Sequence, residues 1–156
     1  MARAKKTTTA KPKAKASAPA PSTAVKKGVE AIVTALNDDY AGVCKRVHEQ
    51  IINDGSVESR NKNAAKQRLE EIEKGTFAYS REFTSKKVGK YTRIQYESGG
   101  KVTPVAFVDS KGQVMAAADE KTPKSNVTYD VTNEESLAKA VSQADWGGNF
   151  INYPQE

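Results

Sequence analysis

Cys44 and His48 are the residues whose types and spacing come closest to a metal site. They are four positions apart, which places both side chains on one face of a helix, and thiolate and imidazole are zinc ligands. They are also the only cysteine and the only histidine of the chain. A closed tetrahedral site would need two carboxylates in addition, so the sequence predicts no metal and no cofactor.

The remaining candidate patterns do not predict catalysis either. The adjacent acid pairs at 38–39 and 70–71 face different directions on a helix, unlike the facing carboxylates of acid–base chemistry. The glycine pairs at 99–100 and 147–148 are followed neither by Lys-Ser/Thr nor by a helix start, so they do not form a phosphate loop. We therefore expect a protein that is not an enzyme.

A basic and aromatic stretch at residues 81–101 indicates binding. Its cations outnumber its acids by four, and two tyrosines lie among them. On a strand Tyr91 and Arg93 share one face, and an open face with a ring beside cations is typical of sequence-tolerant single-strand binding. The alternative is a solvated meander whose lysines protect a sheet edge from aggregation. The predicted nucleic-acid contacts in this stretch are Lys86, Lys87, Lys90, Tyr91 and Arg93.

The N-terminal segment carries the clearest functional signal. Residues 1–28 hold eight lysines and arginines and no acid, so the rest of a chain with net charge +6 sums to −2. Alanine, proline, lysine, serine and threonine cannot bury enough apolar surface to fold, so residues 1–24 are predicted to be a disordered basic tail. Such an arm neutralises phosphates without reading bases. The predicted phosphate contacts are Arg3, Lys5, Lys6, Lys11, Lys13, Lys15, Lys26 and Lys27.

Two other uses of the tail stay open: docking on an acidic protein surface, and an inert leader. Composition also bears on the compartment. One cysteine rules out an internal disulfide framework, and no stretch approaches the roughly 18 apolar residues of a membrane span. The residues before position 25 lack the apolar core of a secretory signal. No membrane partner is expected.

Helical periodicity begins where the prolines stop. Apolar residues recur every three or four positions from Val25 to Ile51. They predict either one helix of about 28 residues, or two helices with a kink where Asn37-Asp38-Asp39 could cap the second. A second helix is predicted up to residue 74, with Ser56 as its N-cap and Gly75 just after its end.

After Gly75 the apolar period changes to two, which is typical of strands. A Thr132–Glu135 capping box then opens a last helix, after which Trp146 and Phe150 are expected to pack beneath the sheet. The five predicted strands cover 76–83, 90–97, 102–109, 113–118 and 126–131.

These elements predict an α+β fold in one domain, residues 25–156. N-terminal helices are followed by a mostly antiparallel meander and a C-terminal helix, and the disordered basic tail precedes them all. A body of this length can bury one adequate core.

Two parts of the chain resemble known proteins. "YTRI", a glycine pair, "VAFVD" and "ADWGGNFI", all within residues 91–151, are similar to a group of small tailed-phage proteins of unassigned function. In those proteins a three-stranded meander precedes a helix and a terminal Asp-Trp-x-Gly. The resemblance implies a viral origin and a compact α/β module, with no activity or site residues. The tail, residues 1–28, resembles linker-histone and viral DNA-packaging tails by composition only.

The expected function is therefore non-enzymatic, sequence-nonspecific nucleic-acid binding by a viral or phage protein, in the host cytoplasm or within the virion. The expected partners are the phosphate backbone of DNA or RNA, and other virion subunits or further copies of the chain. The alternative is a virion structural protein that uses the arm to dock on an acidic neighbouring subunit.

Overall fold

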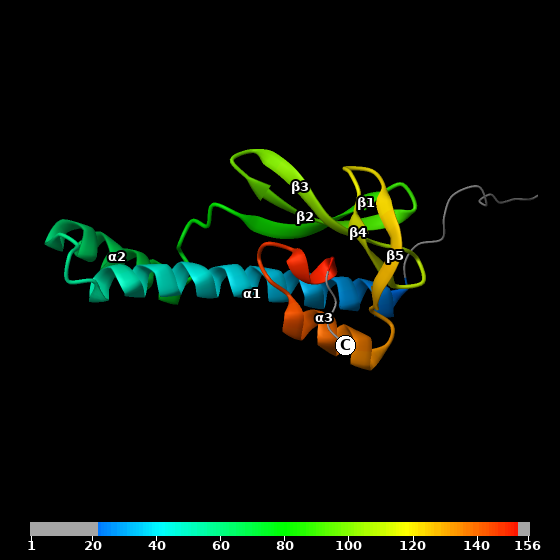
Figure 1. Cartoon of the computed structure of the whole chain (residues 1–156), viewed down its shortest axis with the longest axis horizontal. Coiled ribbons are helices and arrows are strands. Elements are labelled where there is room, and N and C mark those ends of the chain that lie inside the picture. Colours follow the sequence, from blue (N-terminus) through cyan, green and yellow to red (C-terminus); the bar gives the residue numbers. More distant parts are fainter. Residues whose placement is uncertain (1–21, 153–156) are drawn as a thin grey trace, which may run out of the picture.

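The computed structural model describes residues 22–152 of the chain, and most of the predicted tail lies outside this range. Two helices come first, then a five-stranded antiparallel sheet, then a C-terminal helix and a short 3-10 turn (Figure 1). The predicted α+β class is confirmed. The elements are α1 (Thr23–Asn53), α2 (Ser59–Lys74), β1 (Glu82–Val88), β2 (Tyr91–Ser98), β3 (Lys101–Val108), β4 (Gln113–Ala117), β5 (Pro123–Asp130), α3 (Glu134–Gln143) and η2 (Asn149–Ile151).

α1 is a single helix of 31 residues, so the kinked alternative is wrong. The side chain of Asn37, which suggested a second cap, instead binds the backbone of Phe83 in β1. Its amide nitrogen donates to the Phe83 carbonyl at 3.0 Å, and its oxygen accepts from the Phe83 amide at 2.8 Å. β1 is an edge strand, and the Asn37 side chain makes the two hydrogen bonds with Phe83 that a further strand would make. These backbone groups are therefore not available for pairing with another chain.

We expect Asn37→Ala to lower the free energy of unfolding by about 2 kcal/mol, because it leaves a part-buried amide and carbonyl of β1 without their partner. Urea unfolding followed by circular dichroism measures the change. Asn63→Ala is the matched control, since Asn63 is exposed on α2 and should shift stability by less than about 0.5 kcal/mol. Equal effects of the two substitutions would contradict this role of Asn37.

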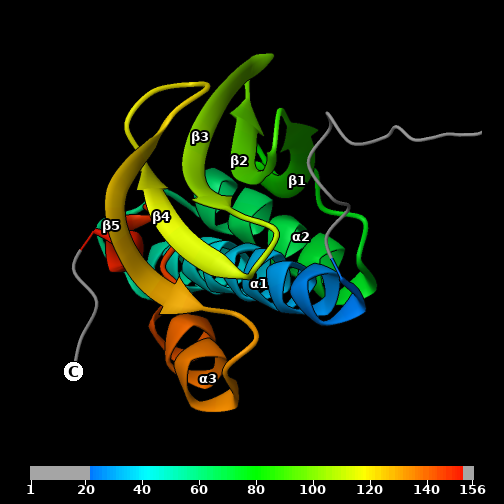
Figure 2. The same ribbon diagram turned by 90° about the vertical axis from the view of Figure 1, so that its right-hand side faces the viewer.

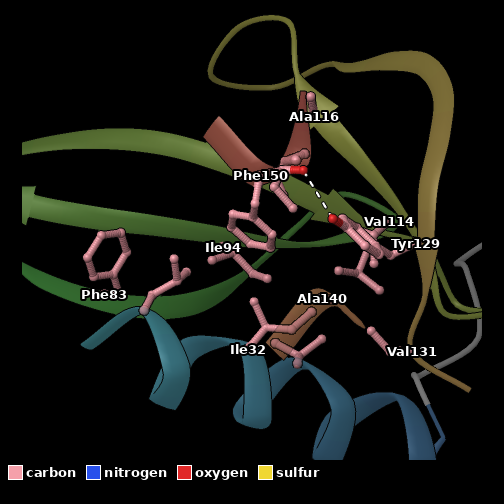
Figure 3. Close-up of a cluster of buried hydrophobic side chains, with 14 of the residues drawn as sticks. Ile32, Phe83, Ile94, Val114, Ala116, Tyr129, Val131, Ala140 and Phe150 are labelled. Carbon is pink, nitrogen blue, oxygen red and sulfur yellow. Dashed lines mark hydrogen bonds between the residues drawn. The ribbon is translucent and has the colours of Figure 1, made fainter. Parts of the chain in front are cut away.

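The sheet is a meander in the order β1-β2-β3-β4-β5, and α1 runs across one of its faces (Figures 1 and 2). Every second residue of a strand points to this face, and the apolar residues of α1 recur about every 3.6 positions on one side of the helix. The two sets of side chains pack against each other and form the core. Tyr129 donates its hydroxyl to the Phe150 carbonyl at 3.2 Å and ties η2 to β5 (Figure 3). The core includes Val25, Val29, Ile32, Leu36, Phe83, Ile94, Val114, Tyr129, Ala140 and Phe150.

The second half of α1 and the whole of α2 extend beyond the sheet as a helical hairpin (Figure 1). Gly75 ends α2 with φ of 76°, a left-handed conformation that glycine adopts without strain. No helix within residues 22–152 is long and apolar enough to cross a membrane.

Two predicted helix caps are wrong for one reason: a nearby aspartate binds the expected capping residue. Asp54 accepts from both the amide and the hydroxyl of Ser56, and α2 begins only at Ser59. Asp130 likewise accepts from both groups of Thr132. The cap of α3 is the next residue, Asn133, whose side chain accepts from the Ser136 amide at 2.9 Å.

The first predicted strand is also displaced. β1 begins at Glu82, and residues 75–81 form an irregular connection whose aromatic rings pack toward α1. The connection is extended, so every second side chain can face α1 without any pairing to a strand. The alternating apolar pattern therefore placed the start of the first strand too early. The other four predicted strands are present, with β5 starting three residues earlier, at Pro123.

Candidate nucleic-acid interface and an aromatic groove

The structure places seven of the predicted nucleic-acid contacts, and the six on residues 3–15 lie outside the described range. Lys26 and Lys27 lie in the first two turns of α1, Lys86 and Lys87 near the end of β1, and Lys90 in the β1–β2 turn; all five are exposed. Tyr91 and Arg93 lie on β2 and are half-buried. The residues outside the range are Arg3, Lys5, Lys6, Lys11, Lys13 and Lys15.

The five exposed lysines share one end of the molecule, which we call the basic end (Lys26, Lys27, Lys86, Lys87 and Lys90; right side of Figure 1). A cleft of ≈ 230 Å³ lies there between α1 and the β1–β2 hairpin. It is lined by Val25, Lys26, Val29, Glu30, Ser85 and Thr92. Thr92 is the cross-strand partner of Lys87, so the hairpin lysines flank the start of α1. The sequence could not show this proximity, because these groups are about sixty residues apart.

The basic end also contains the amino terminus of α1, which carries the positive end of the helix dipole. The first turn contains no acid, and Lys26 and Lys27 add charge of the same sign close by. A lysine there is less favourable than an acid, because the helix terminus favours negative charge. A bound anion would relieve this repulsion.

Tyr91 and Arg93, the residues of the predicted stacking face, contact other groups of the chain. Tyr91 and Arg93 share the face opposite α1, but Tyr91 packs edge-on against Phe107, with centroids 5.6 Å apart. Arg93 donates from Nε to the Gln95 side chain at 2.8 Å and from Nη1 to the Glu120 carbonyl at 2.6 Å. The β4–β5 loop thus folds toward Arg93, a contact that the strand pattern could not indicate. These contacts engage the Tyr91 edge and the Arg93 guanidinium, while Lys90 Nζ lies 5.4 Å from the Tyr91 ring centroid, and nucleic-acid contact by Tyr91 and Arg93 stays a prediction.

Cys44 and His48 lie on one face of α1, but their geometry is that of a helix surface. The His48 ring donates from Nδ1 to the Cys44 carbonyl oxygen, at 2.7 Å, and its ring packs edge-on against Phe77. Among residues 22–152 there is no group of three His, Cys, Asp or Glu side chains that could hold a metal ion.

A second hollow, which no local sequence pattern indicates, lies between the middle of α1 and the connection before β1. We call it the aromatic groove; its volume is ≈ 460 Å³. Phe77 and Tyr79 pack edge-to-face at 4.7 Å, and the Tyr40 ring lies 6.0 Å from Tyr79. Burial raises the pKa of the Tyr79 hydroxyl, and the nearby Cys44 thiol raises it further. The groove is lined by Asn37, Asp38, Tyr40, Ala41, Phe77, Tyr79, Arg81 and Glu82.

Arg81 closes the inner side of the aromatic groove and fastens the C-terminal segment to it. Its guanidinium carbon lies 3.9 Å from the Tyr96 ring centroid and 4.8 Å from that of Trp146, and Nη1 donates to the Trp146 carbonyl at 3.1 Å. Asp39 accepts from the Trp146 amide at 2.8 Å. The predicted packing beneath the sheet is therefore confirmed for Phe150, 5% exposed, and wrong for Trp146, 37% exposed, because Arg81 and Asp39 hold Trp146 at the surface.

Comparison with known proteins gives a family without an assigned function. Residues 8–153 match the model of a family described as "Family of unknown function (DUF7717)". No curated protein and no solved structure matches the chain. The matched range contains the basic end, the aromatic groove and part of the N-terminal segment.

Proposed function

We propose that this chain, which belongs to the family of unknown function DUF7717, is a non-enzymatic protein that binds nucleic acid through its phosphates and without sequence preference. One observation carries the proposal. The hairpin lysines Lys86, Lys87 and Lys90 lie beside the first turns of α1, where the lysine-rich N-terminal segment joins the body. Cations from three parts of the sequence can therefore reach one run of phosphates.

The expected binding is electrostatic. Each phosphate that a lysine neutralises releases condensed counterions, so affinity depends steeply on salt. Lysine is a point charge without a fixed fork, so these contacts position the protein on the backbone and do not specify bases. The residues after position 28 sum to −2, so the excess positive charge of the chain belongs to its first 28 residues.

A phage or viral origin is part of the proposal and rests on the resemblance of residues 91–151 to small tailed-phage proteins. Docking of the arm on an acidic virion subunit would use the same lysines. Binding measurements on nucleic acid separate the two functions, because the docking function does not require affinity for phosphates.

The test replaces Lys86, Lys87 and Lys90 with glutamine in the full chain. Binding to labelled duplex and single-stranded oligonucleotides is measured by fluorescence anisotropy at several salt concentrations. The slope of log affinity against log salt concentration should be less steep than that of the unchanged protein by about 1 to 2. Glutamine in place of Lys45, Lys66 and Lys74, all exposed on the helical hairpin away from the basic end, is the matched control. It removes the same charge and should leave the slope unchanged.

Two results would overturn the proposal in different parts. Equal losses in both variants would assign the effect to overall charge and not to the hairpin. Absence of binding by the unchanged protein at low salt would reject nucleic acid as the partner and favour the acidic subunit.

A further inference from the structure

The cleft at the basic end and the aromatic groove lie along one seam, between α1 and β1. The first is lined by Glu30 and Ser85, and the second, farther along both elements, by Asp38 and Glu82. α1 exposes Lys27, Glu30, Thr34 and Asp38 in steps of three and four residues, which places them on one face of the helix. This exposed face runs from the start of α1 to the aromatic groove.

The aromatic groove has the chemistry of a site for an extended, proline-containing and cationic segment. Grooves lined by aromatic rings recognise such segments, because a proline ring packs on an aromatic face and the extended backbone loses little entropy. Tyr79 is 38% exposed and presents such a face. Asp38 and Glu82 are exposed at the opening, whereas the Arg81 guanidinium stacks on Tyr96 and Trp146. The charge at the opening therefore favours lysine in the bound segment.

The chain's own N-terminal segment contains this chemistry at the required distance. Lys11-Pro12-Lys13 is a proline between two lysines, and Lys15 follows. Asp38 lies about 24 Å from Ser22 along α1, at about 1.5 Å per helical residue. An extended polyproline-type segment covers that distance in about eight residues, at about 3.1 Å each. Counted back from Ser22, residues 11–15 are those for which an extended chain has the length needed to reach the aromatic groove.

We propose that residues 11–15 dock in the aromatic groove of the same chain, with Pro12 against the Tyr40 and Tyr79 rings and the neighbouring lysines beside Asp38 and Glu82. The proposal holds whether or not the protein binds nucleic acid. If it does, docking is autoinhibitory, because a lysine beside these carboxylates cannot contact a phosphate at the same time.

A spin label near the segment tests the proposal in the full chain. Cys44→Ala removes the only cysteine, and Ala10→Cys then gives a single attachment point just before Lys11. With the nitroxide oxidised, the amide signals of Ala41, Tyr79 and Glu82 should lose most of their intensity relative to the reduced sample. Signals of β4 should keep theirs.

Two comparisons identify the contact. Asp38→Asn with Glu82→Gln should restore the groove signals, while Glu49→Gln with Glu73→Gln, exposed acids of α1 and α2 outside the groove, should not. Isotope-labelled protein mixed with unlabelled, spin-labelled protein should show no broadening.

Three results would overturn the proposal. Broadening in the mixed sample would assign the occupant to a second copy. Broadening confined to the start of α1 and the β1–β2 turn would show a segment that does not reach the groove. Broadening that the Asp38 and Glu82 substitutions leave intact would show that their charges do not hold the segment.

Discussion

Glutamine in place of Arg3, Lys5, Lys6, Lys11, Lys13 and Lys15 is expected to reduce the log–log salt slope of duplex binding from about −4 to −5 to about −1 to −2. The larger slope corresponds to about five phosphates neutralised at once, at about −0.9 per contact, since a long arm does not place every lysine. Between 50 and 200 mM salt the unchanged protein should lose about 300- to 1,000-fold in affinity, and the variant about 4- to 16-fold. Fluorescence anisotropy measures both.

Charge substitution is the appropriate change here because deletion of residues 1–28 would damage the fold. Val25 is 1% exposed in the core, and Ser22 caps α1 by accepting from the Val25 amide. A truncation after residue 28 would remove both contacts and mix unfolding with loss of binding. The glutamine variant changes only residues before α1.

The two proposed sets of phosphate contacts can then be weighed against each other. A slope that stays near −4 to −5 after the substitution would place the contacts on the basic end and leave the N-terminal segment as a linker or a protein-docking arm. Sequence preference should be negligible in both proteins, because lysine–phosphate contacts do not read bases. A marked preference would contradict the nonspecific function.

Features that depend on local periodicity were predictable from the sequence. The apolar stripe from Val25 to Leu36 becomes the buried face of α1, and the glycine pair at 99–100 forms the β2–β3 turn with φ of 59° and 81°. Both follow from the backbone and the nearest neighbours in the chain.

Features that depend on one group meeting another far along the chain were not predictable. Asn37 looked like a cap because its partner, the Phe83 backbone, is 46 residues away. Arg93 was expected on an open face because its partner, the Glu120 carbonyl, lies 27 residues away in the sequence. The aromatic groove was missed for the same reason, since its rings Tyr40 and Tyr79 belong to two separate segments.

The candidate interface shows both cases. Composition alone predicts that the lysine-rich segment binds polyanions. The proximity of Lys26 and Lys27 to Lys86, Lys87 and Lys90 depends on how α1 packs along β1, and therefore on side-chain contacts such as that of Asn37.

Gly28→Ala is expected to lower the free energy of unfolding by about 2–3 kcal/mol, although alanine is the better helix former by about 1 kcal/mol. A Cβ atom at position 28 would lie 2.5 Å from Cβ of Val131 and 3.2 Å from its carbonyl oxygen. Val131 cannot easily move away, since it is 3% exposed and its amide donates to the Gly112 carbonyl at 2.8 Å. Overpacking therefore outweighs the gain in helix propensity.

Gly42→Ala is the matched control on the same helix and is expected to have the opposite sign. The nearest atom to a Cβ at position 42 is Nη1 of Arg46, at 3.4 Å, the end of a flexible side chain. Helix propensity then dominates, and stability should rise by about 0.5–1 kcal/mol. Urea unfolding followed by circular dichroism measures both variants. A similar rise in the free energy of unfolding for both variants would mean that α1 can move away from Val131. The close contact between α1 and Val131, which holds Val25, Val29 and Ile32 against the sheet, would then not be a fixed feature of the fold.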